Sequence, residues 1–439
     1  MTRTNILAMW SLAVVGAILC SGCDDTGSPA PLDAALTAAQ WREDLHTVAR
    51  ELPRRHANAF HTVSRASFDS TVSALDSAIP HLGPDSAVVG LRRVITMIGD
   101  GHTNLSLPGN WLRLPVRFAW FGDPVNAPAD LDLRITAAAA PLEHALGARV
   151  VRIGDRTTSG AYAALTSIIA AGESEGSRRE ASTAYMRVPR LLRGLGVTPT
   201  ADSVTLVLVD STGRTSTVAV RPVTRDTRID WHYAASRQPL YLARPDDPFW
   251  FTTLADAKGD SATVYLALGG YPDWIAFWRR SRDLFACIDK HRVQRLVIDL
   301  RDNSGGDFNK VRRLLIPGLR ARATVSTPGH LYVLTGPATF SAAMTNAVDF
   351  RRDLHAVLVG EPTGARPNGY QEGTSFTLPN SHLKVTVSTR YYQFQTEDTP
   401  GVLPDHYAPP NWRDYRDGRD PALSWVLAQP LLPATASAP

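Results

Sequence analysis

Two neighbouring stretches of the sequence carry residues suited to nucleophilic catalysis. The first is an apolar run from Val293 to Leu300 that leads into Gly305 and Gly306, and the second is an apolar run shortly before Ser341. Short apolar runs bounded by turn residues are typical of buried parallel strands, and functional groups of open α/β sheets gather at the strand ends. The sequence therefore predicts a site at one sheet edge that contains Ser341 and both glycines.

A serine hydroxyl is a weak nucleophile, so it needs a base for its proton and donors for the oxyanion. We expect Thr339 to cap a helix that begins here, which puts Ser341 in a first turn with unpaired amides. The amide of Ser341 or Ala342 is then one expected oxyanion donor. Because glycine has no Cβ, Gly305 or Gly306 is expected to bring a second amide close. Taken alone, a serine at a helix start is more often a cap than a nucleophile.

A candidate base lies far upstream, in the loop Gly99-Asp100-Gly101-His102-Thr103. Gly99 and Gly101, before and beside the histidine, let the backbone turn and present His102. A lone loop histidine is more often a surface or capping residue, so its role as a base rests on the resemblance given below. The sequence has no phosphate- or dinucleotide-binding fingerprint and no Cys/His cluster with zinc spacing.

Composition bounds the class of protein. The 439 residues are 44% hydrophobic and 20% charged, with a formal net charge of +4. This is ordinary globular composition, and without a Lys/Arg block it gives no nucleic-acid footprint. Cys287 is the one cysteine downstream of the N-terminal segment, and we expect it to fill core space.

The N-terminus has the pattern of an export signal. Arg3 precedes an apolar stretch from Ile6 to Leu19, which is shorter than a membrane span. Small residues before Cys23 resemble a bacterial lipoprotein cleavage box, although Cys20 stands where leucine is usual. The expectation is an exported protein, periplasmic or at the cell surface, anchored to the membrane by lipid on Cys23. Ordinary secretion with cleavage nearby is the alternative.

By its sequence pattern, the whole chain divides into six units. These are a signal peptide (1–23), a flexible tether (24–36), a helical domain (37–110), a β-rich module with a connection (111–250), a catalytic core (251–428) and a disordered tail (429–439). The β-rich module either grips a peptide at a sheet edge or is a structural insertion. The core alternates strands and helices as stacked parallel βα units do, and ends in a hairpin across 379–381.

Four motifs, in order, carry a family resemblance. They are Gly-Asp-Gly-His-Thr (99–103), Leu-Val-Ile-Asp-Leu-Arg-Asp-Asn-Ser-Gly-Gly (296–306), Thr-Phe-Ser-Ala-Ala (339–343) and Val-Gly-Glu-Pro-Thr-Gly (359–364). The set resembles the tail-specific or C-terminal processing serine peptidases, with their tricorn-core and retinoid-binding relatives. The resemblance implies an α/β fold, a ClpP/crotonase-like spiral of ββα units, often preceded by a PDZ-like module.

The resemblance also implies roles for single residues. The nucleophile maps to Ser341, the base of the tricorn-like branch to His102, and an oxyanion amide to the Gly305–Gly306 turn. Where the Ser-Lys branch has a lysine base, this chain has Arg366, which stays protonated and cannot be a general base. Arg366 is therefore expected to bind a substrate carboxylate or to pair with an acid.

The acid that orients the base is the least defined part of the predicted site. Glu397 is the nearest match to the late glutamate of the tricorn-type tetrad, and Asp398 or Asp100 is the alternative. A solvated loop charge is the other interpretation of Glu397, and Glu361 is expected to be structural.

The resulting hypothesis is a serine peptidase that acts on proteins or peptides without a metal or cofactor. Its alternative is a non-catalytic ligand- or peptide-binding protein on the same fold.

Overall fold

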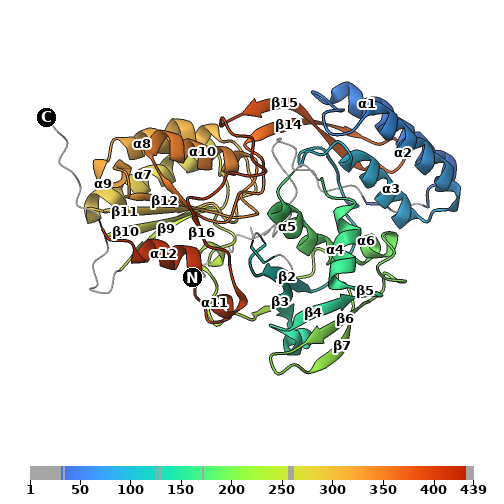
Figure 1. Cartoon of the computed structure of the whole chain (residues 1–439), viewed down its shortest axis with the longest axis horizontal. Coiled ribbons are helices and arrows are strands. Elements are labelled where there is room, and N and C mark those ends of the chain that lie inside the picture. The colour runs from blue at the N-terminus through green and yellow to red at the C-terminus, as the bar shows by residue number, and fades with distance from the viewer. Residues whose placement is uncertain are drawn as a thin grey trace, which may run out of the picture.

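The structure is a computed structural model that describes residues 31–32, 35–124, 126–127, 131–170, 173–255 and 262–431. Three parts are visible in Figure 1: a helical layer, a β-rich module and a larger α/β core. The predicted signal peptide, Cys23 and most of the tether lie outside the described residues, as do residues 432–439. Among the helices described, none is long and apolar enough to cross a membrane.

The helical layer contains three helices: α1 (Ala38–Arg55), α2 (Arg65–Ala78) and α3 (Pro84–Thr96). A capping box begins α1, because the amide of Thr37 donates to Gln40 Oε1 over 2.9 Å and the amide of Gln40 donates to Thr37 Oγ1 over 3.3 Å. The helical period of α1 places Trp41, Leu45 and other apolar side chains on one buried face.

The β-rich module is built on a sheet with the strand order β2-β3-β4-β6-β7, in which β5 pairs with β4 and β8 with β3. Its strands are β2 (Val116–Phe121), β3 (Asp132–Ala139), β4 (Arg149–Ile153), β5 (Arg156–Thr157), β6 (Val204–Val209), β7 (Thr215–Val220) and β8 (Trp231–Tyr233). Its helices are α4 (Thr158–Thr166), α5 (Glu175–Tyr185) and α6 (Pro189–Gly194). Strands β6 and β7 form an antiparallel hairpin, and α4 ends at Thr166.

Helix α6 joins the module to the helical layer through one buried carboxylate. Asp85 of α3 accepts from Arg190 Nε over 2.8 Å and forms a second ion pair with Arg193 over 2.7 Å. Because the carboxylate is buried and both guanidinium groups are on α6, the two parts are held in one orientation.

The core is a sheet with the strand order β16-β13-β12-β11-β10-β9. Its strands are β9 (Phe249–Leu254), β10 (Thr263–Leu268), β11 (Arg295–Asp299), β12 (Leu331–Thr335), β13 (Val357–Gly360) and β16 (His406–Tyr407). All neighbours pair in parallel except β9, which is antiparallel to β10. The predicted parallel βα order is confirmed, and β9 adds an edge strand that begins in the predicted connection.

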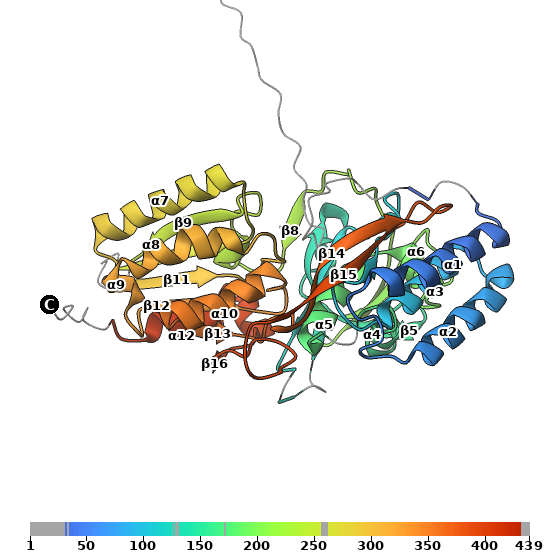
Figure 2. The same cartoon turned by 90° about the horizontal axis from the view of Figure 1, so that it is seen from above.

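Helices cover both faces of this sheet, as Figures 1 and 2 show. On one face lie α7 (Trp274–His291), α8 (Ile316–Arg320), α9 (Ala323–Ser326) and α10 (Ala342–Leu354), and on the other lies α12 (Pro421–Ala428). The strands are buried on both sides, which explains their continuous apolar sequences. Cys287 packs half-buried against the first of these layers, as expected.

A long hairpin leaves the core and reaches the helical layer (Figure 2). Its strands β14 (Asn368–Thr377) and β15 (Lys384–Gln393) are longer than predicted. The short strand β1 (Asn104–Leu105) pairs with β15, with Asn104 opposite Thr386. This pairing brings the loop that contains His102 to the core, although the two segments are far apart in the sequence.

Asp44 of α1 holds the turn of this hairpin. Its buried carboxylate accepts from the amides of Asn380 and Ser381, each over 2.9 Å. We expect Asp44→Ala to lower the free energy of unfolding by about 2 kcal/mol, because two buried amides lose their acceptor. Urea unfolding of the two proteins measures the difference.

A matched control is Asp69→Ala on α2, where an exposed carboxylate lies 3.8 Å from Arg65. Its expected loss is below about 0.5 kcal/mol. Equal losses in the two variants would contradict an anchoring role for Asp44.

Candidate active site

Ser341 occupies a strained turn between β12 and α10. Its backbone angles are φ 50° and ψ −121°, a conformation that non-glycine residues rarely adopt. Such strain costs about 1–3 kcal/mol and is concentrated at functional sites. The predicted capping role of Thr339 is wrong: its Oγ1 accepts from the amide of Gly336 and donates to the carbonyl of Leu300, and α10 begins at Ala342. Ser341 therefore precedes the helix instead of lying in its first turn.

The structure brings the two principal predicted residues together. His102 Nε2 lies 3.0 Å from Ser341 Oγ, within hydrogen-bond reach. The imidazole is buried, and its ring centroid lies 5.0 Å from that of Phe340. Gly101 has to be glycine in this packing, since a Cβ there would lie 2.7 Å from Phe340 Cζ. The aromatic ring thus supports the loop that carries the histidine.

The Gly305–Gly306 turn lies against the serine. A Cβ on Gly305, whose φ is +124°, would be 2.7 Å from Ser341 Cβ and 3.4 Å from the amide of Ala342. The amide of Gly305 already donates to Asn303 Oδ1 over 2.9 Å. The Gly305 amide is therefore already engaged, and the predicted oxyanion donors that remain are the amide of Gly306 and those of Ser341 and Ala342.

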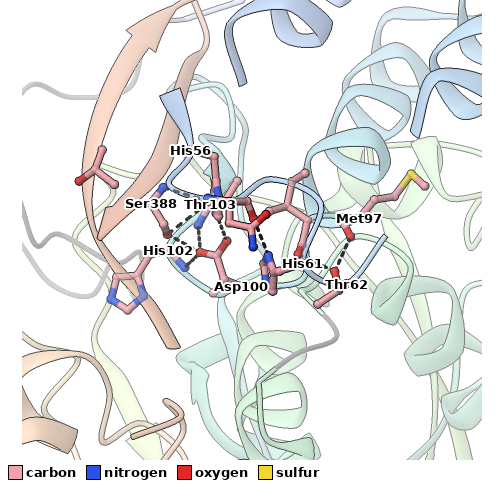
Figure 3. Close-up of polar contacts among 12 residues, drawn as sticks. His56, His61, Thr62, Met97, Asp100, His102, Thr103 and Ser388 are labelled. Atoms are coloured by element: carbon pink, nitrogen blue, oxygen red, sulfur yellow. Dashed lines mark hydrogen bonds and ion pairs between the residues drawn. The ribbon is translucent and has the colours of Figure 1, made fainter. Parts of the chain in front are cut away.

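Asp100 organises the loop around His102, as Figure 3 shows. Its Oδ1 accepts from the amides of His102 and Thr103, over 3.1 and 2.8 Å, and from the hydroxyl of Ser388 on β15. Its Oδ2 lies 2.9 Å from Nε2 of the buried His56. The ring of His102 points away from this carboxylate, so Asp100 positions the backbone of the loop and not the imidazole.

The electrostatics of the loop favour a neutral histidine beside a charged aspartate. Burial lowers the pKa of His102, and the charge of Asp100 acts in the opposite direction without cancelling it. Burial also opposes ionisation of Asp100, but hydrogen bonds from His56 and Ser388 hold the pKa of this carboxyl below its usual value. A neutral imidazole next to a serine hydroxyl is the state that a general base requires.

The predicted orienting acid is not in place. Among the described residues, His102 Nδ1 is buried without a hydrogen-bond partner. Glu397 lies exposed after β15, where its backbone carbonyl accepts from the side chains of Asn368 and Gln395. The alternative acid Asp398 forms an ion pair with Arg366 over 2.8 Å. Two roles were expected for Arg366, and the described contacts show one of them, the pairing with an acid.

Glu173 was not predicted, yet it joins two of the site's loops. Its carboxylate accepts from the amide of Gly101 over 2.8 Å and from the amide of Arg366 over 3.1 Å. Burial raises the pKa of Glu173 to about 7 despite these two hydrogen bonds. The residue therefore fixes the chain position next to His102 from a segment of the β-rich module.

Sequence reasoning also missed His56 and Ser388. Neither lies in a recognisable motif, and each meets Asp100 only through long-range packing. Within the described part of the chain, no three His, Cys, Asp or Glu residues are arranged to hold a metal ion.

Comparisons with solved structures support the fold described above. No family model matches the sequence, and a search of curated proteins finds no match. Among solved structures, mature CPAF complexed with lactacystin matches with a TM-score of 0.59 at 12% identity, covering 86% of this chain and 95% of that one. A CPAF mutant matches with a TM-score of 0.60 at 11% identity, covering 91% and 99%. The photosystem II D1 C-terminal processing protease gives 0.42 at 15% identity, covering 87% and 99%.

The two CPAF matches span nearly the whole of both chains. The similarity to CPAF therefore covers the arrangement of the described parts and is not limited to the core sheet. The predicted α/β architecture, in which helical and β-rich parts precede a parallel core, is confirmed by this likeness. The chain has the fold that the resemblance to the tail-specific peptidases implied.

Proposed function

We propose that this protein is a serine peptidase of the tail-specific, tricorn-like type, with Ser341 as nucleophile and His102 as general base. The observation that carries the proposal is the 3.0 Å contact between Ser341 Oγ and His102 Nε2, made by a serine in a strained turn. Acyl transfer also needs hydrogen-bond donors for the oxyanion, and two backbone amides beside this serine supply them. The substrate class is protein or peptide.

The geometry suits the two halves of acyl transfer. His102 Nε2 takes the proton of Ser341 as Oγ attacks the peptide carbonyl, and the amides of Gly306 and Ala342 stabilise the oxyanion. The protonated His102 then gives its proton to the leaving amine, which leaves an acyl group on Ser341. Water attacks the acyl carbon with His102 again as base, and the free acid and the serine are released.

We also propose that the protein is exported and anchored by lipid on Cys23, in the periplasm or at the cell surface. The support is the sequence pattern of residues 1–23. Residues 24–36 would then tether the body to the membrane, and the substrates would be proteins or peptides of the cell envelope.

Covalent labelling tests the nucleophile and the base. A fluorophosphonate reacts with an activated serine, so we expect the wild-type protein to be labelled and Ser341→Ala to be unlabelled. His102→Ala should lose labelling as well, because no other base contacts Oγ among the described residues. Gel fluorescence with mass-spectrometric identification of the modified peptide measures each outcome.

Glu397→Gln is the matched control, since its carboxylate is exposed and should leave the labelling rate unchanged. A wild-type protein that stays unlabelled would contradict the proposal. It would support the alternative of a binding protein on the same fold, which the unpartnered His102 Nδ1 favours.

Gly305→Ala tests the oxyanion site. The new Cβ would be 2.7 Å from Ser341 Cβ and 3.4 Å from the amide nitrogen of Ala342, so we expect a loss of labelling rate of about 100-fold. Gly213→Ala is the control, because Gly213 also has a positive φ, +85°, but faces open space. Backbone strain alone would affect both variants equally, and equal labelling rates would therefore refute the role of Gly305.

The electrostatics of His102 give a prediction about pH. Because burial lowers its pKa, an NMR titration of the imidazole should show a midpoint below the ordinary value of 6.5. The negative charge of Asp100 favours the imidazolium, so Asp100→Asn should move this midpoint to still lower pH. A midpoint above 6.5, or an upward shift in the variant, would contradict the assignment.

A further inference from the structure

A cavity of about 90 Å³ lies directly beside the proposed nucleophile and base. Its walls come from α3, α5, the loop after α4 and the loops that follow β11 and β12. Phe340, Gly101 and Ser304 line it, and these are the chain neighbours of Ser341, His102 and Gly305. A side chain held in this cavity would therefore belong to a peptide whose backbone reaches the reacting atoms.

Glu180 of α5 lines the cavity with a carboxyl group that has no partner among the described residues. The contrast with Glu175 on the same helix is clear, because that carboxylate binds Tyr162, Arg178 and Arg179. Burial raises the pKa of Glu180 to about 7, and the charge of Asp302 contributes in the same direction. Among the described residues no cation offsets these two effects, so Glu180 has no counter-ion there.

The other charged residues that line the cavity do not provide a counter-ion for Glu180. Arg92 is buried, and its terminal nitrogens donate to Tyr185 Oη over 2.7 Å, to the carbonyl of Ile168 over 3.4 Å and to that of Leu105. Its Nε is buried and has no hydrogen-bond partner among the described residues. Glu173 adds a second carboxyl to the wall.

We propose that this cavity is a substrate subsite for a basic side chain, lysine or arginine, with Glu180 as its counter-ion. The proposal rests on the peptidase function above and specifies its substrate class. Apolar walls that include Ile168, Ala181 and Pro337 suit the methylene stem of such a side chain. An ion pair shielded from water is stronger than one at the surface, and a neutral side chain would leave the carboxyl buried and unpaired.

Peptide hydrolysis tests the preference. In a set of internally quenched peptides, one position at a time carries lysine, its uncharged analogue norleucine, or glutamate. At one position we expect wild-type kcat/KM to favour lysine over norleucine by about tenfold, as one buried charge-assisted contact gives. In Glu180→Gln this ratio should fall to about one, whereas the exposed control Asp283→Asn on α7 should keep it.

Binding to the Ser341→Ala variant separates this proposal from the function it rests on. Fluorescence anisotropy should show tighter binding of the lysine peptide than of the norleucine peptide, and Glu180→Gln in the same background should remove the difference. Hydrolysis by the wild type without any lysine preference would overturn the subsite and leave the peptidase standing. Binding that depends on Glu180, without hydrolysis, would support the subsite and overturn the peptidase.

Discussion

The buried carboxylate of Asp100 is the constraint on which the site depends. It accepts hydrogen bonds from two amides of its own loop and from the hydroxyl of Ser388, and it contacts the imidazole of His56. These contacts join the end of the helical layer to the hairpin of the core. A buried ion without these donors would be strongly destabilising, and each donor is therefore held in place by the need to satisfy the charge. The same network sets the position of His102 without touching its ring. The geometry of the candidate site therefore follows from the hydrogen bonds that satisfy one buried carboxylate.

A second constraint acts from the core. The ends of β11 and β12 are adjacent because the strands pair in parallel, and this adjacency places the Gly305–Gly306 turn against Ser341. The turn at Ser341 stores strain that the surrounding sheet and α10 must offset. A serine that only capped a helix would need neither the positive φ nor a glycine packed on its Cβ. Strain and close packing at the same residue argue for a reactive hydroxyl more strongly than either does alone.

Local pattern was enough to predict the parallel core, because apolar runs and turn residues report directly on buried strands and their ends. It also identified Ser341, the two glycines and, through the family resemblance, His102. The contact between Ser341 and His102 spans 239 residues and depends on the pairing of β1 with β15, which no local signal encodes. The predicted helix cap at Thr339 was wrong for a related reason. Its hydroxyl forms hydrogen bonds within the turn at the strand end, and these tertiary contacts override its capping preference. Glu397 was the nearest match to a motif glutamate, but its side chain lies exposed, and the buried His102 Nδ1 has no hydrogen-bond partner among the described residues.

The β-rich module is part of this site. The segment from Glu173 to Glu180 carries one carboxylate that holds the loop of His102 and another that lines the cavity beside it. Both groups lie on one stretch of chain, so the same segment contacts the loop of His102 and lines the cavity. Asp85 adds to this rigidity by fixing α6 of the module to α3, the helix that leads into the same loop. The helical layer, the module and the core thus each contribute residues to the wall of the cavity beside the candidate site.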